Sequence, residues 1–208
     1  MRAQTKTEEF YNVLTHGFGF LLSIAGLVLL LSYQSYDNGP AILGVFLYGF
    51  SLMILYFAST AYHYVQTDRR KNLFRKIDHI SIYLLIAGTY SPVVLISLAH
   101  SSGWILFWTV WGIAGLGLVL KIFFTGRFEI ISVLLYLIMG WLIVFDFTAL
   151  TEVIDSDGLW LLMGGGSAYT VGIIFYAMNK VKFSHVIWHL FVLAGSILHF
   201  LFIFLKVI

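Results

Sequence analysis

Long apolar runs separated by short polar segments extend along almost the whole chain. Seven of them reach the roughly 20 residues that a helix needs to cross the hydrocarbon of a bilayer. The runs are apolar all round, whereas a membrane β-barrel shows alternating segments of about ten residues. The pattern therefore predicts seven transmembrane helices, near residues 15–33, 41–64, 77–99, 103–124, 129–149, 159–179 and 184–206.

The composition narrows the class of protein further. The 208 residues are 60% hydrophobic and 11% charged, whereas soluble domains are about 45–50% apolar and about 25% charged. These values exclude a soluble enzyme, a disordered chain and a nucleic-acid-binding module, so we expect no nucleic-acid partner. We expect an all-α integral membrane protein that forms a single domain over residues 1–208.

Basic residues lie almost entirely on one side of the predicted membrane. Of the 12 lysines and arginines, only Lys206 falls on the other side of an alternating seven-span trace. Cytoplasmic loops carry an excess of Lys and Arg, so the N-terminus is predicted to be cytoplasmic and the C-terminus external. The basic residues on the predicted cytoplasmic side are Arg2, Lys6, Arg69, Arg70, Lys71, Arg75, Lys76, Lys121, Arg127, Lys180 and Lys182.

Histidine is the most informative residue type here, because imidazole is uncommon in hydrocarbon without a partner. Cysteine is absent, so a metal ion would need His, Asp or Glu ligands. His185 and His189 lie four residues apart, which places both rings on one helix face, about 6 Å apart along the axis. The outer histidines of an HExxH motif bind one metal with this spacing, but no glutamate lies between His185 and His189.

Three further residues are predicted to lie at the same membrane depth. Ser59 and His63 have the same spacing of four near the end of the second span, and Asp78 opens the third span. His63 is a candidate third metal ligand, and a carboxylate such as Asp78 can orient a ligand histidine or a bound water. Three protein ligands with an open fourth position are typical of catalytic zinc, which lowers the pKa of bound water towards 7.

Simpler interpretations stay open for the same residues. Histidines at helix ends can hydrogen-bond to head groups or water, Asp78 could cap the third span, and Ser59 could donate to the carbonyl of Leu55. The first span has a polar face, for which two interpretations stay equally open. It could be a lid or outer shell for the site, or it could be a solvated helix start. Its residues are Glu9, Asn12 and His16.

At these positions the chain resembles the progestin and adipoQ receptor family, in its bacterial hemolysin III branch, over essentially its whole length. The motifs that carry the resemblance are Glu9-x-x-Asn12-x-x-x-His16, Ser59-x-x-x-His63 followed by Asp78, Gly88-Thr89-Tyr90-Ser91-Pro92, and His185-x-x-x-His189. The resemblance implies a zinc ion held by His63, His185 and His189 near the cytoplasmic face, with Ser59 and Asp78 near the metal-bound water. It also implies a multi-pass protein of the bacterial inner membrane.

Three functions follow as expectations. The first is a zinc-dependent hydrolase of a lipid amide or ester, linked to membrane lipid homeostasis, because alkaline ceramidases are similar in this constellation. Its substrate would be a membrane lipid or fatty-acyl compound, with Asp78 and Ser59 as catalytic residues. The second is a lipid sensor or receptor with a structural zinc. The third, a hemolysin-type pore, is disfavoured because the outer halves of the first, second and fourth spans lack polar residues.

Overall fold

The computed structural model describes residues 3–33, 35, 38–178 and 180–208, so Arg2 and position 179 lie outside the described residues. Over these residues the protein is helical, without strands, and seven helical stretches are long and apolar enough to cross a membrane, which confirms the predicted fold class. The α-helices are α1 (Lys6–Tyr33), α2 (Gly39–Tyr64), α3 (Asp68–Pro92), α4 (Gly103–Phe124), α5 (Glu129–Trp141), α6 (Phe147–Val153), α7 (Ser156–Ala177) and α8 (Ser184–Lys206).

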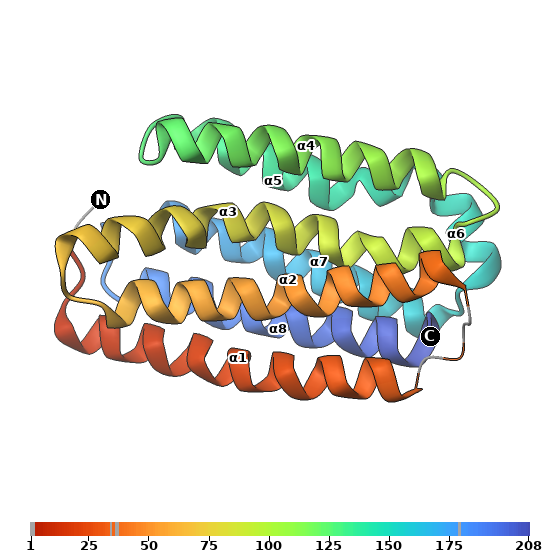
Figure 1. Ribbon diagram of the computed structural model, residues 1–208, viewed down its shortest axis with the longest axis horizontal. Helices are drawn as coiled ribbons and strands as arrows, with labels where there is room; N and C mark the ends of the chain where they lie inside the picture. The colour runs from red at the N-terminus through yellow and green to blue at the C-terminus, as the bar shows by residue number, and fades with distance from the viewer. Residues whose placement is uncertain (1–2, 34, 36–37, 179) are drawn as a thin grey trace.

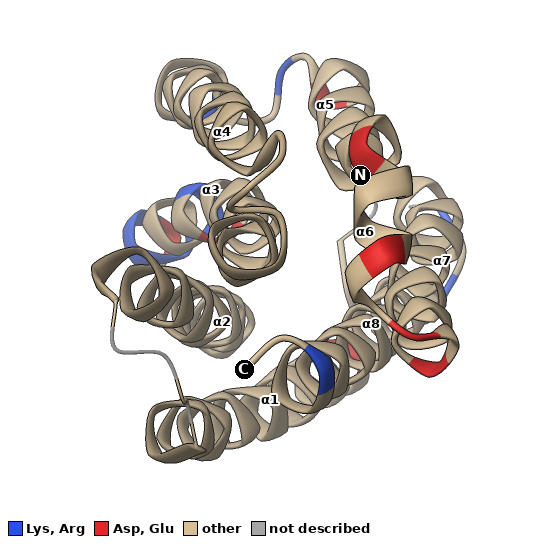
Figure 2. Cartoon of the chain, turned by 90° about the vertical axis from the view of Figure 1, so that its right-hand side faces the viewer, with Lys and Arg blue, Asp and Glu red and all other residues tan. Residues whose placement is uncertain are grey.

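The long helices run side by side and form a ring when viewed along the bundle (Figures 1 and 2). Most helices pack against their neighbours in sequence. The contact between α1 and α8 places the first and last helices side by side. The N-terminus and the C-terminus lie at opposite ends of the bundle, as an odd number of spans requires (Figure 1).

Three helical stretches differ from the predicted spans by more than three residues. The first and third helices begin at Lys6 and Asp68, nine residues before the predicted starts, because the apolar run marks only the part of a helix suited to hydrocarbon. The fifth stretch continues to Val153 but consists of α5, a short 3₁₀ helix over Leu142–Asp146, and α6. The fourth and seventh spans match their predicted bounds.

Close backbone approach between α2 and α3 aligns the two helices that carry Ser59 and Asp78. A β-carbon at Gly88 of α3 would lie 2.1 Å from the Ser51 hydroxyl, and one at Gly44 of α2 would lie 2.9 Å from the Pro92 α-carbon. Pro92 lacks an N–H group, and the helix continues after it as a π-helical turn over Val93–Ser97. Small residues therefore set the spacing of α2 and α3, as in other membrane bundles.

Charge is distributed unevenly between the two ends of the bundle. The end seen in Figure 2 carries acidic residues near α6 and the start of α7, and its one basic residue, Lys206, pairs with Asp155. The hydrogen bond from Lys206 lowers the pKa of the exposed Asp155 carboxyl. The opposite end holds the other lysines and arginines that the structure describes. This asymmetry is the basis of the predicted orientation, with the basic end in the cytoplasm.

The natural absence of cysteine makes this orientation directly testable. We expect a cysteine introduced at exposed Arg70 to be labelled by a membrane-impermeant maleimide only after cells are lysed, because this end is predicted to face the cytoplasm. A cysteine at exposed Asp157, at the opposite end, should be labelled in spheroplasts without lysis. The reverse pattern would contradict the predicted orientation.

Candidate metal site

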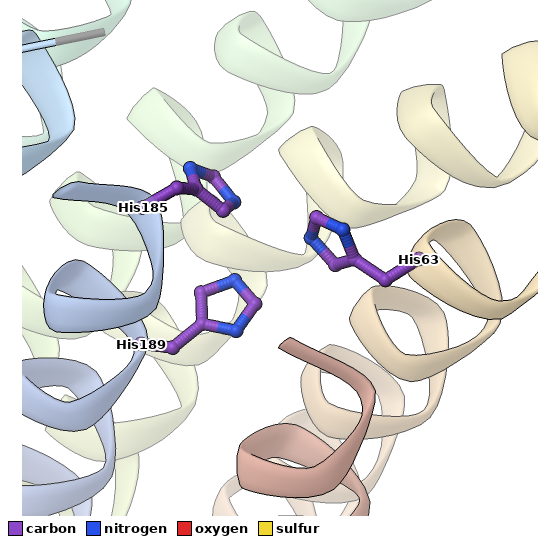
Figure 3. A group of neighbouring side chains, drawn as sticks. All are labelled: His63, His185 and His189. Carbon is purple, nitrogen blue, oxygen red and sulfur yellow. The ribbon is translucent and has the colours of Figure 1, made fainter. Parts of the chain in front are cut away.

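Three histidine side chains from two helices face one another near the basic end of the bundle (Figure 3). His63 comes from the last turn of α2, and His185 and His189 come from the first turns of α8. The ring centroid of His63 lies 5.1 Å from that of His185 and 5.0 Å from that of His189, and the rings of His185 and His189 are 4.6 Å apart. The helix packing thus brings together the three residues predicted as metal ligands.

The geometry of these side chains suits a metal ion. Each offers one ring nitrogen, and the three nitrogens lie within 4.8 Å of one another. Tetrahedral ligands at about 2.0–2.1 Å from zinc are about 3.4 Å apart, so small side-chain rotations would close the set. The Nε2 atoms of His63 and His185 are buried and have no hydrogen-bond partner among the described residues. Buried polar atoms are rarely left without partners, so a bound cation would satisfy them.

Glu9 fixes the orientation of the His63 ring. Its Oε2 atom lies 2.5 Å from His63 Nδ1, and its Oε1 atom accepts a hydrogen bond from Lys71 at 2.6 Å. A carboxylate only accepts hydrogen bonds, so His63 Nδ1 carries the proton and Nε2 keeps its lone pair for a ligand role. Asn12 Nδ2 lies 3.4 Å from the same Nδ1. A carboxylate behind a ligand histidine is the usual outer shell of a metal site.

His16 forms part of the same buried cluster, next to α8. Its ring stacks on that of His189, with centroids 3.5 Å apart and planes 11° apart. Both ring nitrogens of His16 are buried, and neither has a hydrogen-bond partner in the described part of the chain. Asn12 and His16 are 0% and 3% exposed, so the interpretation of these two residues as a solvated helix start is wrong.

Ser59 and Asp78 line a cavity of about 50 Å³ together with His16, His185 and His189. The Ser59 hydroxyl is buried, makes no hydrogen bond to Leu55, and lies beside the Asp78 carboxyl. Asp78 lies almost three turns inside α3, which begins at Asp68. The expectation that Asp78 opens or caps the third helix is therefore wrong, because the basic segment before it is itself helical.

An apolar cavity lies next to the polar one inside the bundle. Leu55, Ile82, Trp188 and Val192 line both, and the inner cavity measures about 100 Å³. Its other walls come from α3, α5, α7 and α8 and are mostly aliphatic and aromatic. The site thus joins a group of polar side chains to a space suited to hydrocarbon.

His79, which the sequence places next to Asp78 at the start of the third span, lines the cavity as well. Arg75 and Tyr176 also line it, and the sequence patterns did not point to these two residues. Arg75 precedes Asp78 by three residues on α3, so helix periodicity could have placed it on the same face. Tyr176 comes from α7, and only the packing of α7 against the other helices brings it here. Neither the distribution of basic residues nor the spacing of the histidines predicts how α7 packs against the other helices.

A second polar cluster lies beside the cavity and ties α3, α4, α5 and α7 together. Lys121 is fully buried and donates to Glu129 Oε2 at 2.9 Å. The other oxygen of Glu129 lies 3.8 Å from His79 Nδ1, and the Tyr176 hydroxyl approaches Oε2 at 3.5 Å. A lysine within a membrane bundle needs such a partner, so Glu129 is fully engaged at this position.

The contact between Glu9 and His63 generates a prediction for metal affinity. Replacing Glu9→Gln removes the charge that holds His63 in its ligand tautomer, and we expect the affinity for a divalent metal to fall about 10- to 100-fold. Competition with a chromogenic chelator in detergent measures this change. Glu152→Gln, exposed at the opposite end, should leave the affinity unchanged. Equal affinities for Glu9→Gln and the unmodified protein would show that Glu9 does not support the site.

Comparison with known proteins identifies the family of the chain. The model of the family described as "Haemolysin-III related" matches residues 4–200. The chain is 44% identical to Hemolysin-3 of Bacillus cereus, over 93% of its own length and 89% of that protein's. It is 42% identical to the Hemolysin-3 homolog of Bacillus subtilis strain 168, over 92% of its own length and 91% of that protein's.

A more distant similarity links the chain to a human protein. The chain is 27% identical to the human monocyte to macrophage differentiation factor, over 93% of its own length and 82% of that protein's. Together with the bacterial relatives, this similarity confirms the family resemblance that the motifs indicated. The chain belongs to the haemolysin-III-related family of multi-pass membrane proteins.

Proposed function

We propose that this protein is a zinc-dependent hydrolase of a lipid amide or ester, acting near the cytoplasmic face of the bacterial inner membrane. One observation carries the proposal: the cavity lined by His185 and His189 also has Ser59 and Asp78 in its wall, and an apolar cavity lies next to it. A nucleophile, a proton acceptor and a space for an acyl chain would then meet at one point.

The donor set favours zinc. Three imidazoles with an open fourth position are typical of catalytic zinc sites, whereas calcium and magnesium prefer oxygen ligands. When bound, a zinc ion supplies Lewis acidity, which polarises a carbonyl and lowers the pKa of water.

Asp78 and Ser59 provide the remaining chemistry. Asp78 lines the cavity beside the histidines and is placed to accept the proton that attacking water loses, and to return it to the leaving amine or alcohol. The Ser59 hydroxyl lies beside Asp78 at this cavity and would donate to the oxygen on which negative charge develops. Glu9 holds His63 and leaves the reacting atoms to these two residues.

The apolar cavity supplies a binding site for the substrate chain. Four residues line both the polar and the apolar cavity: Leu55, Ile82, Trp188 and Val192. Burying methylene groups there contributes about 0.8 kcal/mol each. A lipid bound in this way would keep its acyl chain among the helices and its amide or ester bond at the histidines.

The metal is the first point to test. Detergent-purified protein should contain about one zinc per chain by elemental mass spectrometry, as expected for a three-histidine site. The His185→Ala/His189→Ala variant should contain none while keeping its helical circular dichroism. An absence of metal in the wild type, purified without chelator, would break the hydrolase proposal.

Turnover is the second point. Among lipid amides and esters screened with zinc-loaded protein, any true substrate should be hydrolysed about 10²- to 10⁴-fold more slowly by Asp78→Asn, because a general base contributes this much. The variant should retain zinc, since Asp78 is not among the three ligands. Asp157→Asn, exposed at the other end, serves as the matched control. Zinc binding without turnover would instead support a structural metal in a lipid sensor.

A further inference from the structure

Arg75 places a positive charge at the wall of the polar cavity. It lies on α3, three residues before Asp78, and both side chains line the cavity next to His185 and His189. Arg75 is only partly exposed. A guanidinium presents a rigid fork of donors that suits carboxylate and phosphate groups.

The carboxylates nearest this end of the bundle are engaged elsewhere. Glu9 binds His63 and Lys71, and Glu129 binds Lys121. Arg75 forms no ion pair within the described residues: no carboxylate oxygen, including those of Asp78, lies within 4.0 Å of its side-chain nitrogens. Arg75 therefore brings a guanidinium without a carboxylate partner to the cavity wall, where it can bind an anion that the described residues do not supply.

The turn between α4 and α5 lies against Arg75 on its other side. Gly126, with a φ of 84°, places its backbone there, and a β-carbon at this position would lie 3.5 Å from Arg75 Nη2. Gly126 N donates to Glu129 Oε1 at 3.2 Å, so the ion cluster of Glu129 and Lys121 also anchors this turn. The turn thus limits how far the guanidinium can swing away from the cavity.

Neighbouring basic residues do not share this environment. Arg69, Arg70 and Lys76 are exposed, and none of them lines the cavity. Lys71 is paired with Glu9. Arg75 therefore differs from the other basic residues at the start of α3, which are exposed or paired and do not line the cavity.

We propose that Arg75 binds an anionic group, a carboxylate or a phosphate, on the lipid whose amide or ester bond lies at the histidines. This inference rests on the proposed function and narrows its substrate class to anionic lipids. Arg75 would act as a specificity-determining residue: it holds the charged end of the lipid at the membrane surface, while the acyl chain fills the apolar cavity.

Matched lipid pairs test the charge preference through binding alone. N-oleoylglycine and N-oleoylethanolamine share an acyl chain and an amide, but only the first carries a carboxylate. Oleoyl lysophosphatidate and monooleoylglycerol form the corresponding pair for phosphate. Binding in detergent can be followed by tryptophan fluorescence, since Trp188 lines both cavities. The wild type should bind the anionic member of at least one pair about tenfold or more tightly than its neutral partner.

Variants at two neighbouring positions assign the preference to a residue. Arg75→Gln should bind both members of the pair equally, whereas Arg75→Lys should retain part of the preference. Lys76→Gln makes the same charge change one residue along α3 and should behave as wild type. Circular dichroism and zinc content of each variant check its folding. An unaltered preference in Arg75→Gln, or none in the wild type for either pair, would overturn the inference.

A final comparison separates this inference from the proposed function. In the His185→Ala/His189→Ala variant, a preference that depends on Arg75 should persist. If it disappears there yet survives in Arg75→Gln, the metal binds the anion and the inference fails. A charge preference without hydrolysis of any probe would refute the hydrolase proposal and leave the role of Arg75 intact.

Discussion

Burial of imidazole groups away from water is the constraint on which the site depends. His63 and His189 are each 1% exposed, and ring nitrogens of His16, His63 and His185 have no partner among the described residues. In a bundle that presents apolar faces to lipid, such groups are unfavourable unless something satisfies them. The rest of the cluster fits this need, because Glu9 supports His63 from behind while the open nitrogens face one another.

The fold supplies this cluster through a few close contacts. Glycines let α3 approach α2 until only small side chains fit between them, and α1 packs between α2 and α8 so that its polar face reaches the histidines. The Lys121 and Glu129 pair holds the neighbouring α4–α5 turn in place. The polar cavity is therefore flanked by the contacts of Glu9 with His63 and of Lys121 with Glu129, and an apolar cavity lies next to it inside the bundle.

Local spacing allowed much of this to be predicted from sequence. A helical spacing of four fixed the relation of His185 to His189, and the same rule placed Asn12 and His16 on one face. The apolar runs predicted seven spans because the bilayer imposes a length on each. Distances between helices were not predictable in this way. The positions of Arg75 and Tyr176 at the cavity, and the burial of Lys121, depend on how α3, α4 and α7 pack, which no single stretch of sequence encodes.

X-ray absorption at the zinc edge, measured on the purified protein, tests the central claim most directly. The account predicts about three nitrogen ligands and one oxygen ligand at about 2.0–2.1 Å, with the imidazole scattering pattern, and loss of this shell in His63→Ala. A spectrum with an all-oxygen shell, or one that His63→Ala leaves unchanged, would contradict a zinc site built from His63, His185 and His189.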